Sequence, residues 1–289
     1  MSSSFAILTD TTRCTGCERC VEACRQANNL GDDLPRRWKR RIDDLSSTRF
    51  TTIVRRRDDR QPGIRFVRQQ CRHCVEPACE SACLVGALKK TPQGPVIYDS
   101  DKCMGCRYCM MACPYGIPRY TWEDAVPYVR KCDMCYTRLV DAEGRPIEGA
   151  KPACVEACPQ EATIFGPRDK LLQIAQDRLD AADPGTYVDR IYGKTEIGGT
   201  SVIYISDVPL DFLAFKPNLG DQPLPELTWA ALSKVPPLVV GVGAAMTGIW
   251  WIVGRRMKLA ADAAESTMEG HEIHQEPAEP AESSEEPEK

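Results

Sequence analysis

The chain has 289 residues, a formal net charge of −4 and 16 cysteines. This length can bury a sizeable core, which excludes a small scaffold that folds only through covalent staples. The cysteines therefore indicate a disulfide framework, zinc sites or iron–sulfur clusters, and their spacing has to decide. The charge is uneven, because residues 259–289 hold ten acidic residues and one lysine and leave the remainder net basic.

Residues 1–10 contain neither a positively charged region nor a long apolar stretch. We therefore expect no signal peptide and no twin-arginine leader. Any export would have to depend on a partner protein.

The cysteines fall into four groups of four, with none left over. The groups are Cys14, Cys17, Cys20 and Cys24; Cys71, Cys74, Cys79 and Cys83; Cys103, Cys106, Cys109 and Cys113; and Cys132, Cys135, Cys154 and Cys158. The segment CTGCERCVEAC of the first group aligns without a gap on CMGCRYCMMAC of the third, and PACESAC of the second matches PACVEAC of the fourth. This order predicts a duplicated two-motif unit, roughly 14–88 and 103–164.

The spacing of the first and third groups is that of bacterial ferredoxins. A CxxCxxC loop can wrap three thiolates around one 4Fe-4S cube, and in two-cluster ferredoxins the last cysteine of CxxCxxCxxxC binds the other cube. Cys113 is followed by Pro114, as in the bacterial signature, whereas Cys24 is followed by Arg25. All sixteen cysteines fit four cubes, so the sequence predicts four 4Fe-4S clusters.

Other chemistries fit the cysteine groups less well. The fourth group taken alone resembles a zinc ribbon, although its last gap is three residues rather than two. Disulfides between such densely repeated CxxC pairs would close many small strained loops, and no CxxCH occurs for covalent haem. His73, inside the second group, is interpreted as a hydrogen-bond donor that tunes a potential or as a surface residue. GVGAAMTG at Gly241 is a poor dinucleotide fingerprint and follows no strand.

Residues 25–70 form an arginine-rich insertion between the first two groups. Its arginines include Arg36, Arg37, Arg40, Arg41, Arg55, Arg56 and Arg57. Two interpretations stay open, a solvated charged surface or docking on an acidic partner. The run lacks interleaved aromatics and any recognisable nucleic-acid module, so no nucleic acid is expected.

After the last cysteine, the pattern predicts a strand at 162–165, an amphipathic helix at 169–182 and a strand at 200–205. These elements are expected to pack on the core. No candidate nucleophile, general base or substrate-pocket signature occurs along the chain, so we predict a non-catalytic protein.

Residues 235–253 run for nineteen residues without a charge, close to the roughly 20 that a membrane-spanning helix needs. Trp250 and Trp251 near one end, followed by Arg255, Arg256 and Lys258, indicate an interfacial belt and a positive flank. We predict a single spanning helix over 235–254 with a cytoplasmic C-terminus, which would place the clusters outside the cytoplasm. The acidic, Pro- and Glu-rich residues 260–289 are expected to be disordered.

The whole pattern resembles the iron–sulfur subunits of membrane-bound respiratory oxidoreductases, notably the uptake nickel-iron hydrogenase type and the beta subunit of formate dehydrogenase. The stretches that carry the resemblance are CRHCVEPACESACLVGALKK, CMGCRYCMMACPYGIPRY, KPACVEACPQEATIFGPRDKLL and YGKTEIGGTSV. It implies electron transfer between a catalytic subunit of hydrogenase or molybdopterin type and a membrane cytochrome b or quinone-binding subunit. ALKKTPQGPVIYDSDKC and GGTSVIYISDVP are closer to the hydrogenase type, whereas the missing leader is typical of the formate dehydrogenase type.

The resemblance also implies how the cysteines share the clusters. The implied ligand sets are Cys14, Cys17, Cys20 and Cys158; Cys24, Cys132, Cys135 and Cys154; Cys71, Cys74, Cys79 and Cys113; and Cys83, Cys103, Cys106 and Cys109. We call them sets A, B, C and D in this order.

Together these patterns predict an α+β protein of duplicated bacterial-ferredoxin-like cluster domains with one C-terminal transmembrane helix. The expected parts are a cluster domain at 1–168, packing elements at 169–234, the spanning helix at 235–254, and a basic flank with an acidic tail at 255–289. The protein would be anchored in the inner membrane, with its cluster domain in the periplasm. The alternatives are a soluble polyferredoxin, whose apolar segment packs on a partner, and a zinc-binding scaffold.

Overall fold

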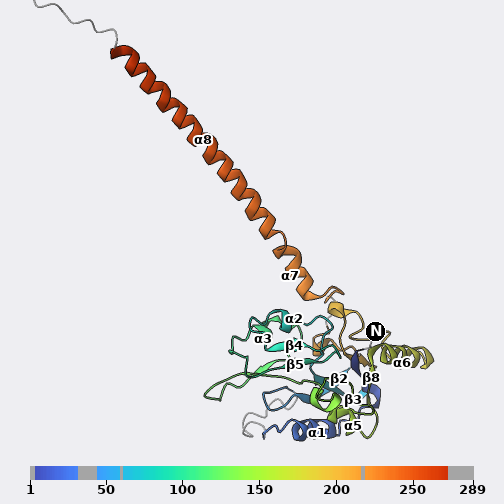
Figure 1. Cartoon of the computed structure of the whole chain (residues 1–289). Helices are drawn as coiled ribbons and strands as arrows, with labels where there is room; N and C mark the ends of the chain where they lie inside the picture. The colour runs from blue at the N-terminus through green and yellow to red at the C-terminus, as the bar shows by residue number, and fades with distance from the viewer. Residues whose placement is uncertain (1–3, 32–43, 59–60, 216–218, 273–289) are drawn as a thin grey trace, which may run out of the picture. The chain divides into compact units, whose positions relative to one another are not determined.

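The computed structural model describes residues 4–31, 44–58, 61–215 and 219–272 (Figure 1). The chain divides into two compact units, Met1–Thr228 and Trp229–Lys289. The first unit carries all sixteen cysteines and the second carries the long apolar helix.

A three-stranded sheet with one helix forms the part of the first unit that lacks cysteines. It consists of β1 (Phe5–Asp10), β8 (Thr163–Pro167) and β9 (Val202–Ile205), with α6 (Arg168–Ala181) packed on the sheet. The strand order is β8-β1-β9, with β1 antiparallel to β8 and parallel to β9. Leu8, Leu171 and Ile203 are buried where helix and sheet meet. The predicted strands and helix after the last cysteine are confirmed to within two residues at each boundary.

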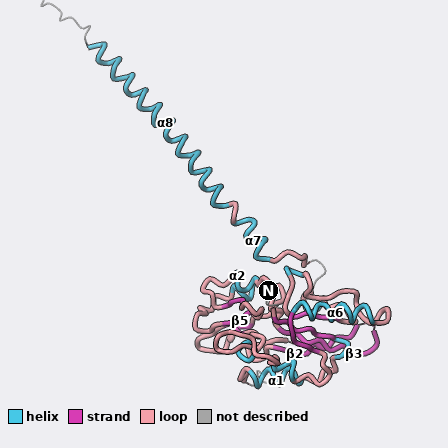
Figure 2. Tube along the Cα trace, turned by 45° about the vertical axis from the view of Figure 1, so that its right-hand side comes forward, coloured by secondary structure: helices cyan, strands magenta, loops and turns pink. Residues whose placement is uncertain are grey.

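Three two-stranded hairpins make up the remaining strands. They are β2 (Thr51–Asp58) with β3 (Gln61–Gln70), β4 (Leu88–Lys90) with β5 (Val96–Tyr98), and β6 (Arg119–Tyr120) with β7 (Val129–Arg130). All three are antiparallel. The β2–β3 hairpin is the longest, and its strands run side by side in Figure 2.

Short helices accompany the cysteine groups. They are α1 (Arg19–Ala27), α2 (Ala78–Ser81), α3 (Tyr108–Ala112), α4 (Tyr136–Leu139) and α5 (Ala153–Glu156). Each contains a cysteine or begins directly after one. Helix, sheet and irregular loop therefore mix within the cluster-bearing unit, as the predicted α+β class requires.

The arginine-rich insertion is partly a buried hairpin. Arg55, Arg56 and Arg57 are exposed on β2, as a solvated surface requires. However, Ile53 of β2 is 3% exposed and Arg68 of β3 is 1% exposed. The interpretation of 25–70 as charged surface is therefore wrong for the inner face of this hairpin, because alternate strand residues point to opposite faces. Arg36, Arg37, Arg40 and Arg41 lie outside the described residues.

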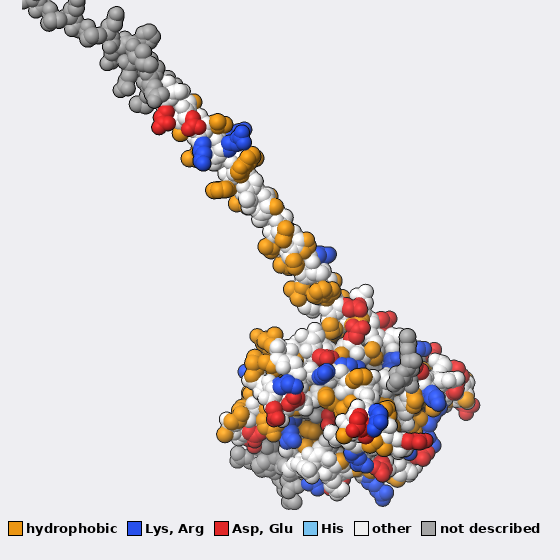
Figure 3. Space-filling model, in the orientation of Figure 1, with side chains coloured by type: hydrophobic (Ala, Val, Ile, Leu, Met, Phe, Trp, Pro, Cys, Tyr) orange, Lys and Arg blue, Asp and Glu red, His pale blue; other side chains and the backbone are white. Residues whose placement is uncertain are grey.

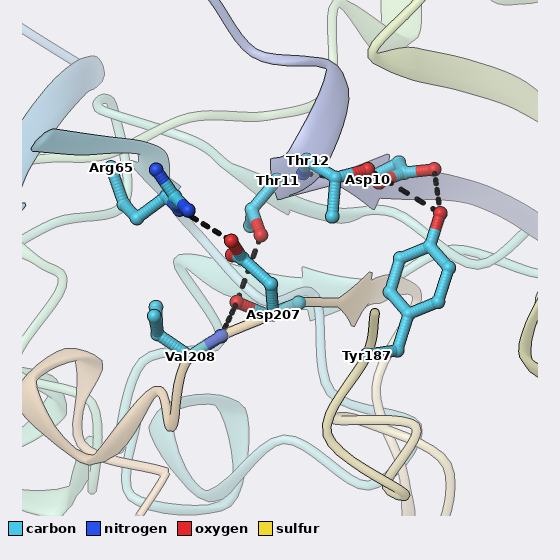
Figure 4. A network of polar contacts seen from close by, with 8 residues as sticks. Asp10, Thr11, Thr12, Arg65, Tyr187, Asp207 and Val208 are labelled. Atoms are coloured by element: carbon cyan, nitrogen blue, oxygen red, sulfur yellow. Dashed lines mark hydrogen bonds and ion pairs between the residues drawn. The ribbon is translucent and has the colours of Figure 1, made fainter. Parts of the chain in front are cut away.

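A network of polar contacts surrounds the end of β1, just before the first cysteine group (Figure 4). The buried Asp10 carboxylate accepts a hydrogen bond from the Tyr187 hydroxyl at 3.0 Å and pairs with Arg178 at 3.0 Å. Nearby, Arg65 of β3 forms an ion pair with Asp207, which follows β9. The Asp10 contacts join residues 178–187 to the end of β1, and the Arg65–Asp207 ion pair joins β3 to the segment after β9.

The second unit is helical over its described residues. The boundary at Trp229 lies within helix α7 (Leu224–Leu232), and α8 (Val235–Glu272) contains the predicted apolar segment. Residues from Leu224 to Ser266 are long and apolar enough to cross a membrane, with a mean hydropathy of 1.6 in the best window, none of it buried. Figure 3 shows apolar side chains along the helix and a group of basic ones beyond them.

Helix α8 continues past the position where the disordered tail was expected to begin. Residues 260–272 are helical, so the expectation of disorder is wrong for them. Ala260, Ala261, Ala263 and Ala264 explain the difference, because alanine has the highest intrinsic helix propensity. The remaining tail residues, 273–289, lie outside the described residues.

Candidate iron–sulfur centres

The first and third cysteine groups have the same local backbone. Gly16 and Gly105 have φ of +70° and +72°, a region that glycine adopts at little cost. Two residues later, Glu18 and Arg107 are also left-handed, with φ of 59° and 65°, and each precedes a helix. Each loop therefore curls back on itself between its cysteines, which turns the thiols of one loop toward a common point.

The second and fourth groups share another backbone pattern. His73 and Met134, each directly before a cysteine, have φ of 47° and 62° and are 1% exposed. Pro77 and Pro152 each begin the short helix that carries the third cysteine of its group. The equivalent residues of the two PAC segments thus occupy equivalent positions in the backbone.

Set A surrounds one cavity. Its lining includes Cys14, Cys17, Cys20 and Cys158, together with Ile53 and Arg68 of the β2–β3 hairpin. Three of these cysteines come from the first group and one from the fourth, 138 residues further along the chain than Cys20. This is the combination that the resemblance implies for set A.

Set D surrounds a second cavity. Cys83, Cys103, Cys106 and Cys109 line it with Leu88, Tyr98 and Val129 of three strands. Here the third group supplies three cysteines and the second supplies one. The two cavities are therefore built in the same way, each on a loop with the CxxCxxC spacing.

Cysteines of the other two sets interact electrostatically with one another. Cys24 interacts with Cys135 and Cys154, and Cys132 interacts with both Cys24 and Cys154, which assembles set B. Cys74 interacts with Cys71, Cys79 and Cys113, which assembles set C. The thiols of sets B and C therefore interact with one another, while their assignment as ligand sets stays a prediction.

Electrostatic interactions between thiols also link one set to the next. Cys20 of set A interacts with Cys154 of set B, and Cys132 of set B interacts with Cys71 of set C. Cys79 of set C interacts with Cys109 of set D. These interactions link the sets in the order A, B, C, D, which we call the row, with sets A and D as its two ends.

Buried thiols of the metal-free protein hold their protons. Burial raises the pKa of Cys20 to about 11, an effect that Arg68 opposes and Cys154 strengthens. Burial likewise raises the pKa of Cys79 to about 12 and of Cys109 to about 11. Because iron binds thiolates, loading these sites has to release protons. Among the described residues, no three Cys, His, Asp or Glu side chains are grouped as for a single metal ion.

The second cysteine group is held in place by residues 199–202, which follow α6 in the chain. Thr200 forms a β-bridge with Cys74, and the Gly199 carbonyl accepts a hydrogen bond from the Val75 N–H at 3.0 Å. The Ser201 N–H donates to the Arg72 carbonyl at 3.1 Å. The stretch YGKTEIGGTSV thus supports the cysteine loop and lines neither of the cavities of sets A and D.

Residues 63–168 match the family model of the 4Fe-4S dicluster domain. A protein of Nitratidesulfovibrio vulgaris is 43% identical over 267 residues, which are 90% of this chain and 69% of the relative. The hydrogenase-2 operon protein HybA of Escherichia coli O157:H7 is 35% identical over 250 residues, 75% of this chain and 74% of HybA. The B subunit of the anaerobic dimethyl sulfoxide reductase of Escherichia coli K12 is 37% identical over 178 residues, 59% of this chain and 77% of the relative.

This chain therefore belongs to the ferredoxin-type iron–sulfur subunits of respiratory oxidoreductases. As a member of this family it carries 4Fe-4S clusters, transfers electrons and is not itself the catalytic subunit. Its catalytic partner is an oxidoreductase subunit. The apolar helix α8 fits a membrane anchor.

His73 of this iron–sulfur subunit is buried, so its interpretation as a surface residue is wrong. Its Nδ1 accepts a hydrogen bond from the Val96 N–H at 2.9 Å, while Nε2 is buried and has no partner among the described residues. Burial, with Lys131 and Lys90 nearby, holds the pKa of His73 well below its usual range. A neutral imidazole with Nδ1 as acceptor carries its proton on Nε2, so a donor remains next to the second group.

Sequence reasoning missed the buried cations of the iron–sulfur subunit. Lys131 donates to the Val96 and Cys132 carbonyls, the latter at 2.8 Å. Arg72 donates to the Tyr204 hydroxyl, and its guanidinium lies 4.6 Å from the ring centroids of both Tyr204 and Phe215. The sequence feature that could have pointed to Arg72 and Lys131 is that each directly adjoins a cysteine.

Proposed function

We propose that this subunit relays electrons through four 4Fe-4S clusters, one held by each of sets A to D. The observation that carries the proposal is that two cavities, those of sets A and D, are each lined by four cysteines from two groups, with electrostatic interactions linking them through sets B and C. The clusters would supply one-electron chemistry, and the protein contributes ligands, burial and local charge. Sixteen cysteines in four complete sets leave no ligand position to another residue type.

The two ends of the row are the natural points of electron entry and exit. Cys17 of set A is exposed and Cys106 of set D is partly exposed, whereas all four cysteines of set B are buried. An electron could then reach a partner from either end without a route through the protein core. The direction of flow depends on the potentials of the partners.

We further propose that α8 spans the membrane once and anchors the cluster-bearing unit. Exposed apolar residues such as Leu238, Val240 and Ile249 support this, as do Trp250 and the basic residues that follow it. The competing possibility is a soluble polyferredoxin whose helix packs on a partner. Carbonate extraction separates the two: we expect the protein in the membrane pellet, and release into the supernatant would contradict a spanning helix.

The positive flank after the helix supports a cytoplasmic C-terminus and a periplasmic cluster unit. Arg255, Arg256 and Lys258 follow the apolar segment, and Lys234 precedes it. Protease added to intact spheroplasts should digest the cluster unit and leave a C-terminal tag intact. Digestion only from the cytoplasmic side would overturn this orientation.

We propose a catalytic partner of hydrogenase or molybdopterin type, and a membrane cytochrome b or quinone-binding subunit as the second partner. The support is the similarity to HybA and to the B subunit of dimethyl sulfoxide reductase. Mass spectrometry and metal analysis of the complex purified anaerobically in mild detergent decide between the types. Nickel indicates a hydrogenase and molybdenum or tungsten a molybdopterin enzyme, and a complex with neither metal would contradict both.

A further inference from the structure

Arg68 is a fully buried cation without a hydrogen-bond partner. It lies on β3 with 1% of its surface exposed, and none of its three guanidinium nitrogens has a partner among the described residues. Leaving one charged group buried and unpaired is strongly unfavourable. A buried cation of this kind therefore requires an anionic acceptor beside it.

The position of Arg68 identifies the acceptor. Its side chain lines the cavity of set A with Cys14, Cys20 and Cys158. Its charge also interacts with Cys154 and Cys132 of set B. The guanidinium thus lies between the first two ligand sets of the row, where sulfur atoms carrying negative charge would surround it.

The other cations near the sets, buried or partly buried, have protein partners. Lys90 donates to the Cys74 carbonyl at 2.6 Å, and Lys131 donates to the Cys132 carbonyl at 2.8 Å. Arg72 is paired with the Tyr204 hydroxyl and with aromatic rings. Among these four side chains, only Arg68 keeps its whole donor set free.

We infer that Arg68 donates hydrogen bonds to the sulfur atoms of sets A and B and raises the reduction potentials of both clusters. The inference rests on the proposed relay through sets A to D. Reduction adds one negative charge to a cluster, so a fixed cation and its N–H donors stabilise the reduced form more than the oxidised form. Arg68 acts through the ligands and is a positioning residue that sets the electron-accepting tendency of one half of the row.

Set D lacks this feature. The cation that lines its cavity is Arg107, which is exposed to solvent and stacks on Trp122 with its guanidinium 5.1 Å from the ring centroid. Solvent screens an exposed charge far more than a buried one. The two ends of the row should therefore differ in potential, with set A above set D as far as these two arginines contribute.

The test is a redox titration of the full-length subunit in its complex, in which electron paramagnetic resonance monitors the reduction of each cluster. Arg68→Gln should lower the equilibrium constant for reduction of each of two clusters about tenfold. For a one-electron couple this is a decrease of about 59 mV in the reduction potential. The potentials of the other two clusters should be unchanged. Arg68→Lys keeps the charge and should shift the same two clusters by less. Arg57→Gln is the matched control, because it removes an exposed charge from the neighbouring strand β2 and should shift none.

A second measurement covers the case in which Arg68→Gln fails to assemble. In the wild-type complex labelled with ¹⁵N-guanidino arginine and reduced with a europium(II) chelate, pulsed resonance should detect a ¹⁵N coupling to a cluster. The coupling should disappear in Arg68→Lys. Its absence from the wild-type protein would contradict the inference.

The outcomes separate the inference from the relay. Full iron content with four unshifted potentials in Arg68→Gln overturns the role of Arg68 and leaves the relay intact. A wild-type subunit without iron–sulfur clusters overturns the relay and the inference with it.

Discussion

The two ends of the row are built on loops with the same cysteine spacing, yet their surroundings differ. Set A and set D each take three cysteines from a CxxCxxC loop and one from a distant group. Around set A lie Ile53 and the buried Arg68, whereas Leu88, Val129 and the exposed Arg107 surround set D. The loop determines which cofactor binds, and the neighbouring strands determine the charge that the cofactor meets.

The largest expected effect comes from replacing equivalent ligands at the two ends. Cys17→Ser and Cys106→Ser should each remove one cluster, about a quarter of the iron, because a serine hydroxyl is a poor substitute for a thiolate. Iron analysis and spin quantification of the anaerobic complex measure this loss. Met104→Leu, between two ligands of set D, should keep the full iron content. Undiminished iron in either serine variant would contradict the assignment of its set.

Replacing Gly16 and Gly105 with alanine should destabilise the two loops to different extents. Alanine at either position has to adopt positive φ, which costs roughly 1–2 kcal/mol. At Gly16 the new Cβ would also lie 2.3 Å from the Phe66 ring, whereas at Gly105 it would lie 3.0 Å from the Tyr120 hydroxyl. Gly16→Ala should therefore lower the thermal unfolding midpoint more than Gly105→Ala. Equal midpoints in the two variants would contradict the tighter packing at set A.

Disrupting the polar network beside set A should have a smaller effect, a loss of stability. Asp10→Ala removes the acceptor of Tyr187 and Arg178 and should destabilise the cluster unit by about 2–3 kcal/mol, or about 5–10 °C in the midpoint. The matched control is Asp101→Ala, an exposed aspartate just before the third group, which should change stability by less than about 0.5 kcal/mol. A midpoint of Asp10→Ala that matches the control would show that the network does not stabilise this end.

The smallest expected effect is a difference in thiol reactivity of the metal-free protein. Burial opposes ionisation of Cys103, but polar hydrogens of Tyr98, Gly105 and Val129 directed at its sulfur hold its pKa below the ordinary value. Burial instead raises the pKa of Cys20 to about 11. Between pH 7 and 9, iodoacetamide should therefore modify Cys103 faster than Cys20, since the thiolate is the reactive form. Peptide mapping measures both rates, and faster modification of Cys20 would contradict this difference between the ends.

The cysteine spacing contained most of what could be predicted. It predicted the four groups and the cluster type, and the family resemblance supplied the pairing of distant cysteines. The apolar periodicity located the sheet and helix after the last group. Arg68 could not be predicted, because in the sequence it resembles the exposed arginines of the same insertion, and only the pairing of β2 with β3 turns it inward. The helical continuation to Glu272 was hidden by the acidic composition of the tail, although its alanines favour helix.

The most direct test of the relay is quantification of iron, acid-labile sulfide and zinc in the anaerobically purified complex, combined with spin counting after reduction. The account predicts four irons and four sulfides for each of four clusters on this subunit, bound by its sixteen cysteines, with no zinc on this subunit. Zinc in place of iron, or fewer than four clusters in protein that has never met oxygen, would contradict it.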